Sequence, residues 1–228
     1  MKMQKNNPIK YPYFKTTLKA LFLLFVNINL AFSAPMNDST FQKNKVIPKS
    51  ILNEVTEALT HYPELINTPI EFKFKSNIKK SFMQAQPKFI DIFKNKKKRS
   101  YYAMISENVT IEEEVFTVAD VPTEVLIGWI GHELGHIMDY RERSGFNMLM
   151  FGIRYFFFKG FIKEAEIAAD TYAVNHGMGN YILATQDFIL NHTSLSENYK
   201  NRIKSLYMSP DEIMLLLEAL QELEAQVD

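Results

Sequence analysis

Residues 131–136 read Gly131-His132-Glu133-Leu134-Gly135-His136, and this hexapeptide predicts a metal-binding helix. On an α-helix, residues four positions apart lie about 40° apart around the axis, so the imidazoles of His132 and His136 can converge on one ion. Glu133 is turned about 100° from His132, which places its carboxylate beside the ion. This spacing favours a zinc site in which the glutamate activates a zinc-bound water.

The sequence around the hexapeptide is strongly apolar. The expected helix, 122–143, carries seven further apolar residues, namely Val125, Leu126, Ile127, Trp129, Ile130, Ile137 and Met138. An accidental pair of histidines on a surface helix is the alternative, but such a helix is normally apolar on one face only. We therefore expect a helix that passes through the core of the protein.

A second helical segment supplies carboxylates. Glu166 follows His136 by thirty residues and Asp170 follows Glu166 by four, so the two acids share one helix face. One of them can bind the metal while the other orients a ligating histidine through its free ring nitrogen. Glu164 is an alternative ligand, but it does not share this face with Asp170. A catalytic zinc ion needs three protein ligands and keeps one position open for water.

The two motifs together, His132-Glu133-x-x-His136 and Glu166-x-x-Ala169-Asp170, resemble those of the gluzincin metallopeptidases. Among these enzymes the chain is most similar to the HtpX-like and CAAX prenyl endopeptidase family, whose several membrane-spanning helices it lacks. The resemblance implies a zincin-like fold, one zinc ion held by His132, His136 and Glu166, and Glu133 as the general base. It also implies that Asp170 orients a ligand and that the substrate is a peptide or protein.

Residues 196–206 are similar to a late helix of that family, around Arg202-Ile203. The family commonly has His-Pro shortly before this arginine, and the present chain does not. A donor for the developing oxyanion is expected, and Tyr199, Arg202 and His192 are the candidates for this role or for a substrate contact.

Two more polar residues are weaker candidates for the site. Asp139 follows His136 by three residues and lies on the histidine face. His176 precedes Gly177 at an expected helix end, where we expect it to bind free backbone carbonyls rather than a metal.

The fold class is predicted from the order of the elements. Four segments alternate or are rich in β-forming residues, namely 69–75, 81–86, 100–106 and 114–118, with a short helical turn at 87–93. One helical pattern, 51–59, precedes the strands. The others come after them, at 122–143, 147–159, 163–176, 180–191, 195–208 and 210–226. We therefore expect an α+β domain with a small antiparallel-type sheet and a mainly helical, metal-bearing half. The strand 100–106 or 114–118 is expected to lie along the cleft and pair with an extended substrate.

The N-terminal segment has a composition of its own. Residues 1–19 carry five lysines and no acid, residues 20–26 are apolar, and Ala31 and Ser33 are small. This is the pattern of a signal peptide, with cleavage after Ser33 and export to the periplasm or the medium. An uncleaved N-terminal membrane anchor is the alternative. Residues 34–46 are expected to be a flexible lead-in to a single domain, 47–228.

Charge and cysteine content exclude several functions. The chain carries 26 basic and 26 acidic residues and no cysteine, so a disulfide framework and any thiolate chemistry are excluded. Without residues 1–33 the basic count falls to 21, which leaves a net charge of minus five and argues against a nucleic-acid partner. The basic run 94–99 is expected to be a solvated connection rather than a nucleic-acid or anionic-surface contact.

The segment 148–162 is conspicuously apolar, but Arg154 and Lys159 interrupt it and it is too short to span a bilayer. We expect a helix packed across the two metal-bearing helices. A hydrophobic lid over the cleft and a peripheral membrane contact are the alternatives.

The sequence therefore predicts an exported zinc endopeptidase. The alternatives are a non-catalytic exported zinc-binding module and an inactive relative of the peptidases that acts by binding. A structural zinc ion normally has four protein ligands, and only three are evident here, which favours catalysis.

Overall fold

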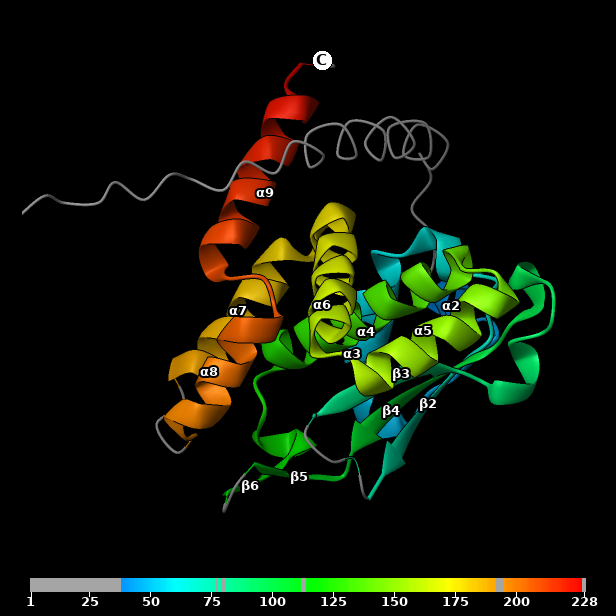
Figure 1. Ribbon diagram of the computed structural model, residues 1–228, viewed down its shortest axis with the longest axis horizontal. Helices are drawn as coiled ribbons and strands as arrows, with labels where there is room; N and C mark the ends of the chain where they lie inside the picture. The colour runs from blue at the N-terminus through cyan, green and yellow to red at the C-terminus, as the bar shows by residue number, and fades with distance from the viewer. Residues whose placement is uncertain (1–37, 77, 79–80, 112–113, 192–194, 227–228) are drawn as a thin grey trace, which may run out of the picture. The chain divides into compact units, whose positions relative to one another are not determined.

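The computed structural model describes residues 38–76, 78, 81–111, 114–191 and 195–226, which belong to the unit Asp38–Asp228. The expected signal peptide, its cleavage site and the candidate His192 lie outside the described residues. The fold is α+β, as predicted, with a four-stranded sheet and a larger helical part (Figure 1).

The main sheet has the strand order β1-β2-β4-β3. Its strands are β1 (Lys45–Val46), β2 (Ile70–Lys75), β3 (Met83–Pro87) and β4 (Tyr101–Ser106). Both β1 and β4 run parallel to β2, and only β3 runs antiparallel to β4. The expectation of an antiparallel sheet is therefore wrong, because the helix α3 (Leu52–Thr60) and the segment after β2 allow parallel crossovers that the strand patterns do not encode.

Two segments differ from the expected assignment. Residues 38–46 were expected to be a flexible lead-in, but they form the short helix α2 (Asp38–Phe41) and the strand β1. Lys45 fixes this segment, because its ammonium group donates hydrogen bonds to the carbonyls of Leu65, Ile66 and Thr68. The expected strand at 114–118 is β6 (Glu114–Thr117), which pairs with β5 (Asn108–Ile111) in a separate two-stranded sheet.

The helical part follows the sequence pattern closely. Its helices are α4 (Thr123–Glu142), α5 (Gly145–Phe157), α6 (Lys159–Ala173), α7 (Gly179–Asn191), α8 (Glu197–Leu206) and α9 (Pro210–Glu224). Short 3-10 turns lie at η1 (Lys49–Ile51), η2 (Pro63–Leu65), η3 (Phe89–Asp91), η4 (Lys96–Lys98) and η5 (Val118–Asp120), and η6 (Val174–Met178) is a π-helical turn. The last helix begins with a reciprocal cap between Ser209 and Glu212. No helix of the described residues has the length and apolar character needed to cross a membrane.

Helix α4 occupies the centre of the helical part. It packs against α3, α6 and α7 and against the strand β3, and fourteen of its residues are buried. In Figure 1 the helices α7, α8 and α9 lie on the side away from the strands β2, β3 and β4. The prediction of a buried α4 is confirmed, and its burial on most sides explains why the sequence shows no single apolar stripe.

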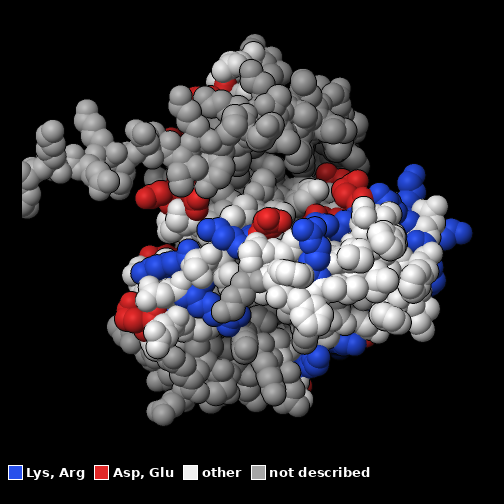
Figure 2. All heavy atoms as spheres, viewed as in Figure 1, with Lys and Arg blue, Asp and Glu red and all other residues white. Residues whose placement is uncertain are grey.

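The apolar segment 148–162 forms α5 and the start of α6. The ring of Phe151 packs against Tyr140 of α4 and Phe161 of α6, so α5 does lie against both helices. Only one face of α5 is buried, however, and Figure 2 shows uncharged side chains over this part of the surface.

Candidate metal centre

Two histidines of α4 point to the same place. The ring centroids of His132 and His136 lie 4.7 Å apart with an angle of 87° between the planes. Both residues are buried, with 7% and 6% of their surface exposed. Since α4 is surrounded by other elements, the two imidazoles are held in a protein interior rather than in solvent.

Glu166 reaches the histidines from α6. Its Oε2 atom lies 3.0 Å from Nε2 of His132 and 3.4 Å from Nε2 of His136. The other carboxylate oxygen, Oε1, accepts a hydrogen bond of 2.9 Å from the hydroxyl of Tyr155 on α5. The structure therefore brings together two ring nitrogens and one carboxylate oxygen that lie 34 and 30 residues apart in the sequence.

These three side chains can hold one metal ion. Their ligand atoms all lie within 4.8 Å of one another, and each residue is buried. In a tetrahedral zinc site with bonds of about 2.0–2.2 Å, neighbouring ligand atoms lie about 3.3–3.6 Å apart. The separations of 3.0 and 3.4 Å are close to this spacing, and imidazole with carboxylate is a donor set that suits zinc.

Asp170 holds His132 from the opposite side of the ring. Its Oδ1 atom lies 2.8 Å from Nδ1 of His132, and its Oδ2 atom accepts a hydrogen bond of 3.1 Å from the amide of Met208. An imidazole that donates Nδ1–H to a carboxylate presents a free Nε2 lone pair, which is the form that binds a metal.

The charges of the cluster are coupled. Although burial acts in the opposite direction, the imidazoles of His136 and His132 hold the pKa of Glu166 well below its usual range. Burial likewise disfavours the imidazolium of His132, but the carboxylates of Asp170 and Glu166 raise its pKa well above the usual value. The site therefore has a strong demand for positive charge at its centre, which a divalent ion would meet.

Glu133 lies beside the cluster rather than in it. Its carboxylate accepts a hydrogen bond from the backbone amide of Ala85 in β3. Burial raises the pKa of this carboxyl above its ordinary value. The sequence pattern placed Glu133 beside the ion, and the structure has it pointing to the neighbouring strand.

The strand next to the site is β3. It is an edge strand, because only β4 pairs with it. The strand 100–106 is β4, which lies between β2 and β3 and has no free edge, and 114–118 belongs to the separate hairpin. The expectation that one of these two lies along the cleft is therefore wrong, because strand order depends on long-range pairing.

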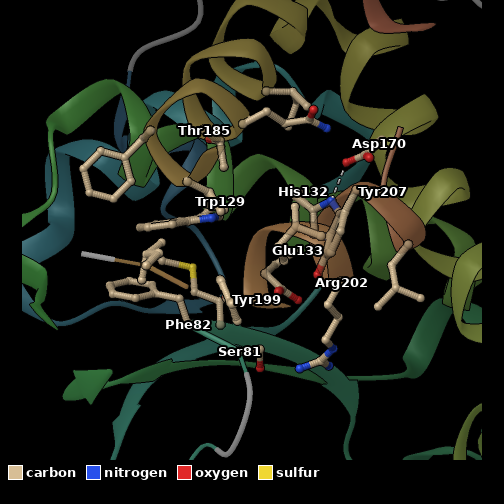
Figure 3. Close-up of a pocket in the computed structure, with 18 of the residues that line it drawn as sticks. Ser81, Phe82, Trp129, His132, Glu133, Asp170, Thr185, Tyr199, Arg202 and Tyr207 are labelled. Carbon is tan, nitrogen blue, oxygen red and sulfur yellow. Dashed lines mark hydrogen bonds and ion pairs between the residues drawn. The ribbon is translucent and has the colours of Figure 1, made fainter. Parts of the chain in front are cut away.

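Two cavities meet at Glu133. The larger has a volume of about 480 Å³ and lies between β3 and the helices α4, α5 and α6, with His136 and Glu166 in its wall. The smaller, of about 80 Å³, is lined mainly by apolar side chains of α4, α7 and α8, and His132 lies in its wall. In Figure 3 its apolar end is formed by Trp129 and Phe82, whose rings stack 4.3 Å apart.

The late candidates lie close to this site. Tyr199 lines the smaller cavity and Arg202 lines both. Two further residues, which the sequence pattern did not single out, contact the cluster. The ring of Tyr207 lies 5.5 Å from that of His132, and Tyr155 donates to Glu166. Isolated tyrosines carry no spacing signal, so only the packing of α5 and of the turn after α8 reveals them. Figure 3 shows Tyr207 beside His132.

The other polar candidates lie elsewhere. Asp139 forms an ion pair of 2.7 Å with Arg143 on the same helix, and Glu164 is exposed on α6. His176 is buried, and its Nδ1 lies 2.7 Å from the carbonyl of Tyr172, in agreement with the expected contact to a free helix carbonyl.

No family model matches the chain, and neither do any of the curated proteins or solved structures with which it was compared. The resemblance to the gluzincin metallopeptidases rests on the two motifs of the sequence and stays a prediction.

Proposed function

We propose that the protein is a zinc-dependent endopeptidase. The observation that carries the proposal is the buried cluster of His132, His136 and Glu166 with Glu133 beside it. Within the described residues no fourth histidine, aspartate or glutamate joins this cluster, which leaves a position for water or substrate. Zinc is the metal proposed because two imidazoles and one carboxylate are the ligands of this class of catalytic zinc site.

The residues around the cluster have distinct roles in the proposed reaction. When bound, zinc supplies a Lewis acid that acidifies a water molecule and polarises a carbonyl. Glu133 takes the proton from the attacking water and returns it to the leaving amine. The raised pKa of Glu133 favours this role, because a base with a pKa nearer neutrality can both accept and return the proton.

The edge of β3 that pairs with no other strand is the proposed place for the substrate backbone. The main-chain groups of Gln84 and Gln86 face β4 and pair with it. Those of Ala85 face the opposite way, where its N–H donates to Glu133 and its carbonyl accepts from the hydroxyl of Tyr140. An extended peptide that replaces Glu133 and Tyr140 as the partner of the Ala85 main chain can add to this edge and so place its scissile bond in the larger cavity. The smaller apolar cavity would then receive one apolar side chain of the peptide.

Tyr155 and Tyr207 are proposed as donors for the developing oxyanion, together with the earlier candidates Tyr199 and Arg202. Burial raises the pKa of the Tyr207 phenol, and burial together with Glu166 raises that of Tyr155. Both hydroxyls therefore keep their protons at neutral pH and can donate hydrogen bonds.

Export after cleavage near Ser33 is part of the same proposal. A secreted or periplasmic peptidase without cysteine does not depend on the redox state of its compartment.

The substitution Glu133→Gln in zinc-loaded protein tests this function. We expect the variant to keep one zinc ion per chain, as measured by mass spectrometry, and to lose at least about 100-fold in the rate of casein or peptide cleavage. Glu164→Gln is the matched control. Because Glu164 is exposed on α6, this substitution should leave the zinc content and the rate of cleavage unchanged.

Two results would contradict the proposal. If Glu133→Gln cleaves peptides as fast as the wild type, the assignment of the base is wrong. If the wild type binds one zinc ion tightly and cleaves no member of a peptide library, the protein is a zinc-binding module or an inactive peptidase relative.

A further inference from the structure

Helix α5 exposes an apolar stripe to solvent. With about 100° per residue, its outward apolar side chains fall within a sector of about 100°. The members of this stripe are Phe146, Leu149, Met150, Ile153 and Phe157, which have between 38% and 71% of their surface exposed. Phe158 follows at the end of the helix with 60% exposed.

The opposite face of α5 is apolar as well. Met148 and Phe151 have only 4% and 6% of their surface exposed and line the larger cavity together with Tyr155. An ordinary surface helix has one apolar face for the core and a polar face for water. A helix that is apolar on both faces is one that normally has a second apolar neighbour.

The turn η3 adds to the same surface. Phe89, Ile90 and Phe93 have 73%, 81% and 73% of their surface exposed. This turn adjoins the start of α5, because a Cβ atom at Gly145 would lie only 2.9 Å from the carbonyl oxygen of Ile92. Phe89 and Met148 also line the same cavity. We call the stripe of α5, Phe158 and these three residues the apolar rim.

The apolar rim is large for an exposed surface. At about 200 Å² for a whole phenylalanine, its five phenylalanines alone expose roughly 700 Å². Contiguous apolar patches on soluble monomers are normally no larger than a few hundred Å², and larger ones mark interaction sites. Of the described large apolar side chains that are exposed, only Val46, Met214 and Leu215 lie outside the rim.

The charge beside the rim is positive. Residues 89–106, which include η3, contain five basic residues and one acid, Asp91, which forms an ion pair with Lys94. Lys94, Lys96, Lys97 and Lys98 are exposed there, whereas Arg99 is buried. Residues 145–163 contain three basic residues and no acid. In Figure 2 basic side chains, and some acidic ones, border a white surface of uncharged side chains. The rest of the chain beyond residue 33 is acidic, so the positive charge is concentrated where the apolar side chains are exposed.

We propose that the apolar rim docks onto an anionic bilayer surface. Exposed phenylalanines next to lysines are the composition with which a protein lies in the interface of a membrane, since the rings enter the acyl boundary and the ammonium groups contact the headgroups. The contact proposed is with one leaflet, because side chains of this kind lie at the boundary of headgroups and acyl chains. This inference goes beyond the proposed peptidase activity and does not depend on it.

Docking would place the larger cavity at the membrane surface, because Met148 and Phe89 belong both to its lining and to the elements of the rim. The substrates that reach the edge of β3 would then be polypeptide segments at or near a lipid surface. The other occupants that the test below distinguishes are a second copy of this chain and the chain's own residues 1–37. Residues 1–19 carry five positive charges, which the lysines beside the rim would repel.

Site-specific labelling of the full chain tests the proposal. Because the sequence has no cysteine, Phe146→Cys creates a single attachment point for an environment-sensitive fluorophore within the rim. Leu215→Cys is the matched control, since Leu215 is 65% exposed on α9, outside the rim. Both proteins are mixed with vesicles of phosphatidylcholine alone or of phosphatidylcholine with phosphatidylglycerol, and iodide quenching is measured.

The expected result is a blue shift and protection from iodide at position 146 with the anionic vesicles, and neither change at position 215. An unchanged label at position 146 would overturn the proposal, as would equal protection at both positions. Protection at position 146 without vesicles would show that the rim is already covered. Loss of this protection on dilution would identify a second copy, and its persistence would identify residues 1–37.

The electrostatic part has a separate test. Lys97→Gln with Lys98→Gln should weaken vesicle binding roughly thirtyfold, and added salt should weaken binding of the wild type. Lys49→Gln with Lys204→Gln removes the same charge from exposed positions outside the rim and should leave binding unchanged. Equal effects of the two pairs would contradict a contact through the rim. Circular dichroism of each variant confirms that it is folded.

Discussion

Gly135 on α4 is the position where a single added methyl group should disturb the metal centre. A Cβ atom at this position would lie 2.4 Å from the carbonyl oxygen of Ala169 on α6, whereas real Cβ contacts essentially never fall below 3.0 Å. Gly135→Ala therefore requires α4 and α6 to move apart by about 0.6–1.0 Å. Because the obstacle is backbone, no side-chain rotation can relieve it.

This displacement acts on the ligands directly. Glu166 lies one turn before Ala169 on α6, and the histidines that it meets lie on α4. Metal–ligand distances tolerate changes of about 0.2 Å, so we expect zinc affinity to fall at least about tenfold. Overpacking costs about 1–3 kcal/mol, and the better helix propensity of alanine offsets about 1 kcal/mol. The net loss is therefore about 0–2 kcal/mol, and at its upper end the melting temperature of the metal-free protein should fall by roughly 4–8 °C.

Two other glycines of α4 provide matched controls for the same substitution. At Gly131 the added Cβ would meet the flexible end of the Met178 side chain, which can move, so stability and zinc affinity should stay near wild type. At Gly128 it would meet the backbone carbonyl of Tyr181 on α7. Gly128→Ala should therefore lower the melting temperature without a comparable loss of zinc affinity, since α7 carries no ligand.

Zinc affinity is measured by competition with a fluorescent chelator, and stability is measured by circular dichroism on the metal-free proteins. The reasoning is refuted if Gly135→Ala binds zinc as tightly as Gly131→Ala. It is also refuted if Gly128→Ala loses as much zinc affinity as Gly135→Ala, because the loss would then follow stability and not the separation of α4 from α6.

Three further predictions concern the metal site and its support. Asp170→Asn should lower zinc affinity by about 10–100-fold in chelator competition, because an amide orients His132 less well than a carboxylate does; unchanged affinity would exclude this role. Removal of metal by a chelator should lower the melting temperature, and zinc at 100 times its dissociation constant should restore about 2.7 kcal/mol of the free energy of unfolding. A melting curve that does not respond to zinc would argue against a metal site in the folded protein. Arg99→Met should lower the free energy of unfolding, measured in urea, by about 1.5–3 kcal/mol, because the buried guanidinium donates a hydrogen bond to the carbonyl of Arg143 at the end of α4. The exposed Lys97→Met is the control, and a smaller effect for Arg99→Met than for this control would contradict the prediction.

The candidate metal ligands were predictable because they lie on helices. A spacing of four residues places His132 with His136, and Glu166 with Asp170, whatever the rest of the fold does. The approach of α6 to α4 could not be read from spacing. Helical spacing showed only that Glu166 and Asp170 share a face, and the resemblance to a family with both motifs then assigned Glu166 as the ligand and Asp170 as the residue that orients a ligand.

The sheet was harder to predict, since strand patterns do not specify partners. The segments 70–75, 83–87 and 101–106 show their strand character in sequence, but their order depends on contacts between residues far apart in the chain. The two residues of β1 are too few to show any periodicity. The same limit applies to Tyr155 and Tyr207, whose places near Glu166 and His132 follow only from how separate elements pack.

The short strand β1 has a practical consequence for handling this protein. It covers the outer edge of β2, whose other edge is occupied by β4. A truncated chain that begins at Pro48 would keep every residue of the metal centre, but it would leave the backbone groups of Ile70 and Glu71 without their partners Lys45 and Val46. An unpaired edge of this kind recruits strands from other molecules. Such a shortened protein should therefore self-associate through β2, and a chain that retains Asp38 should not.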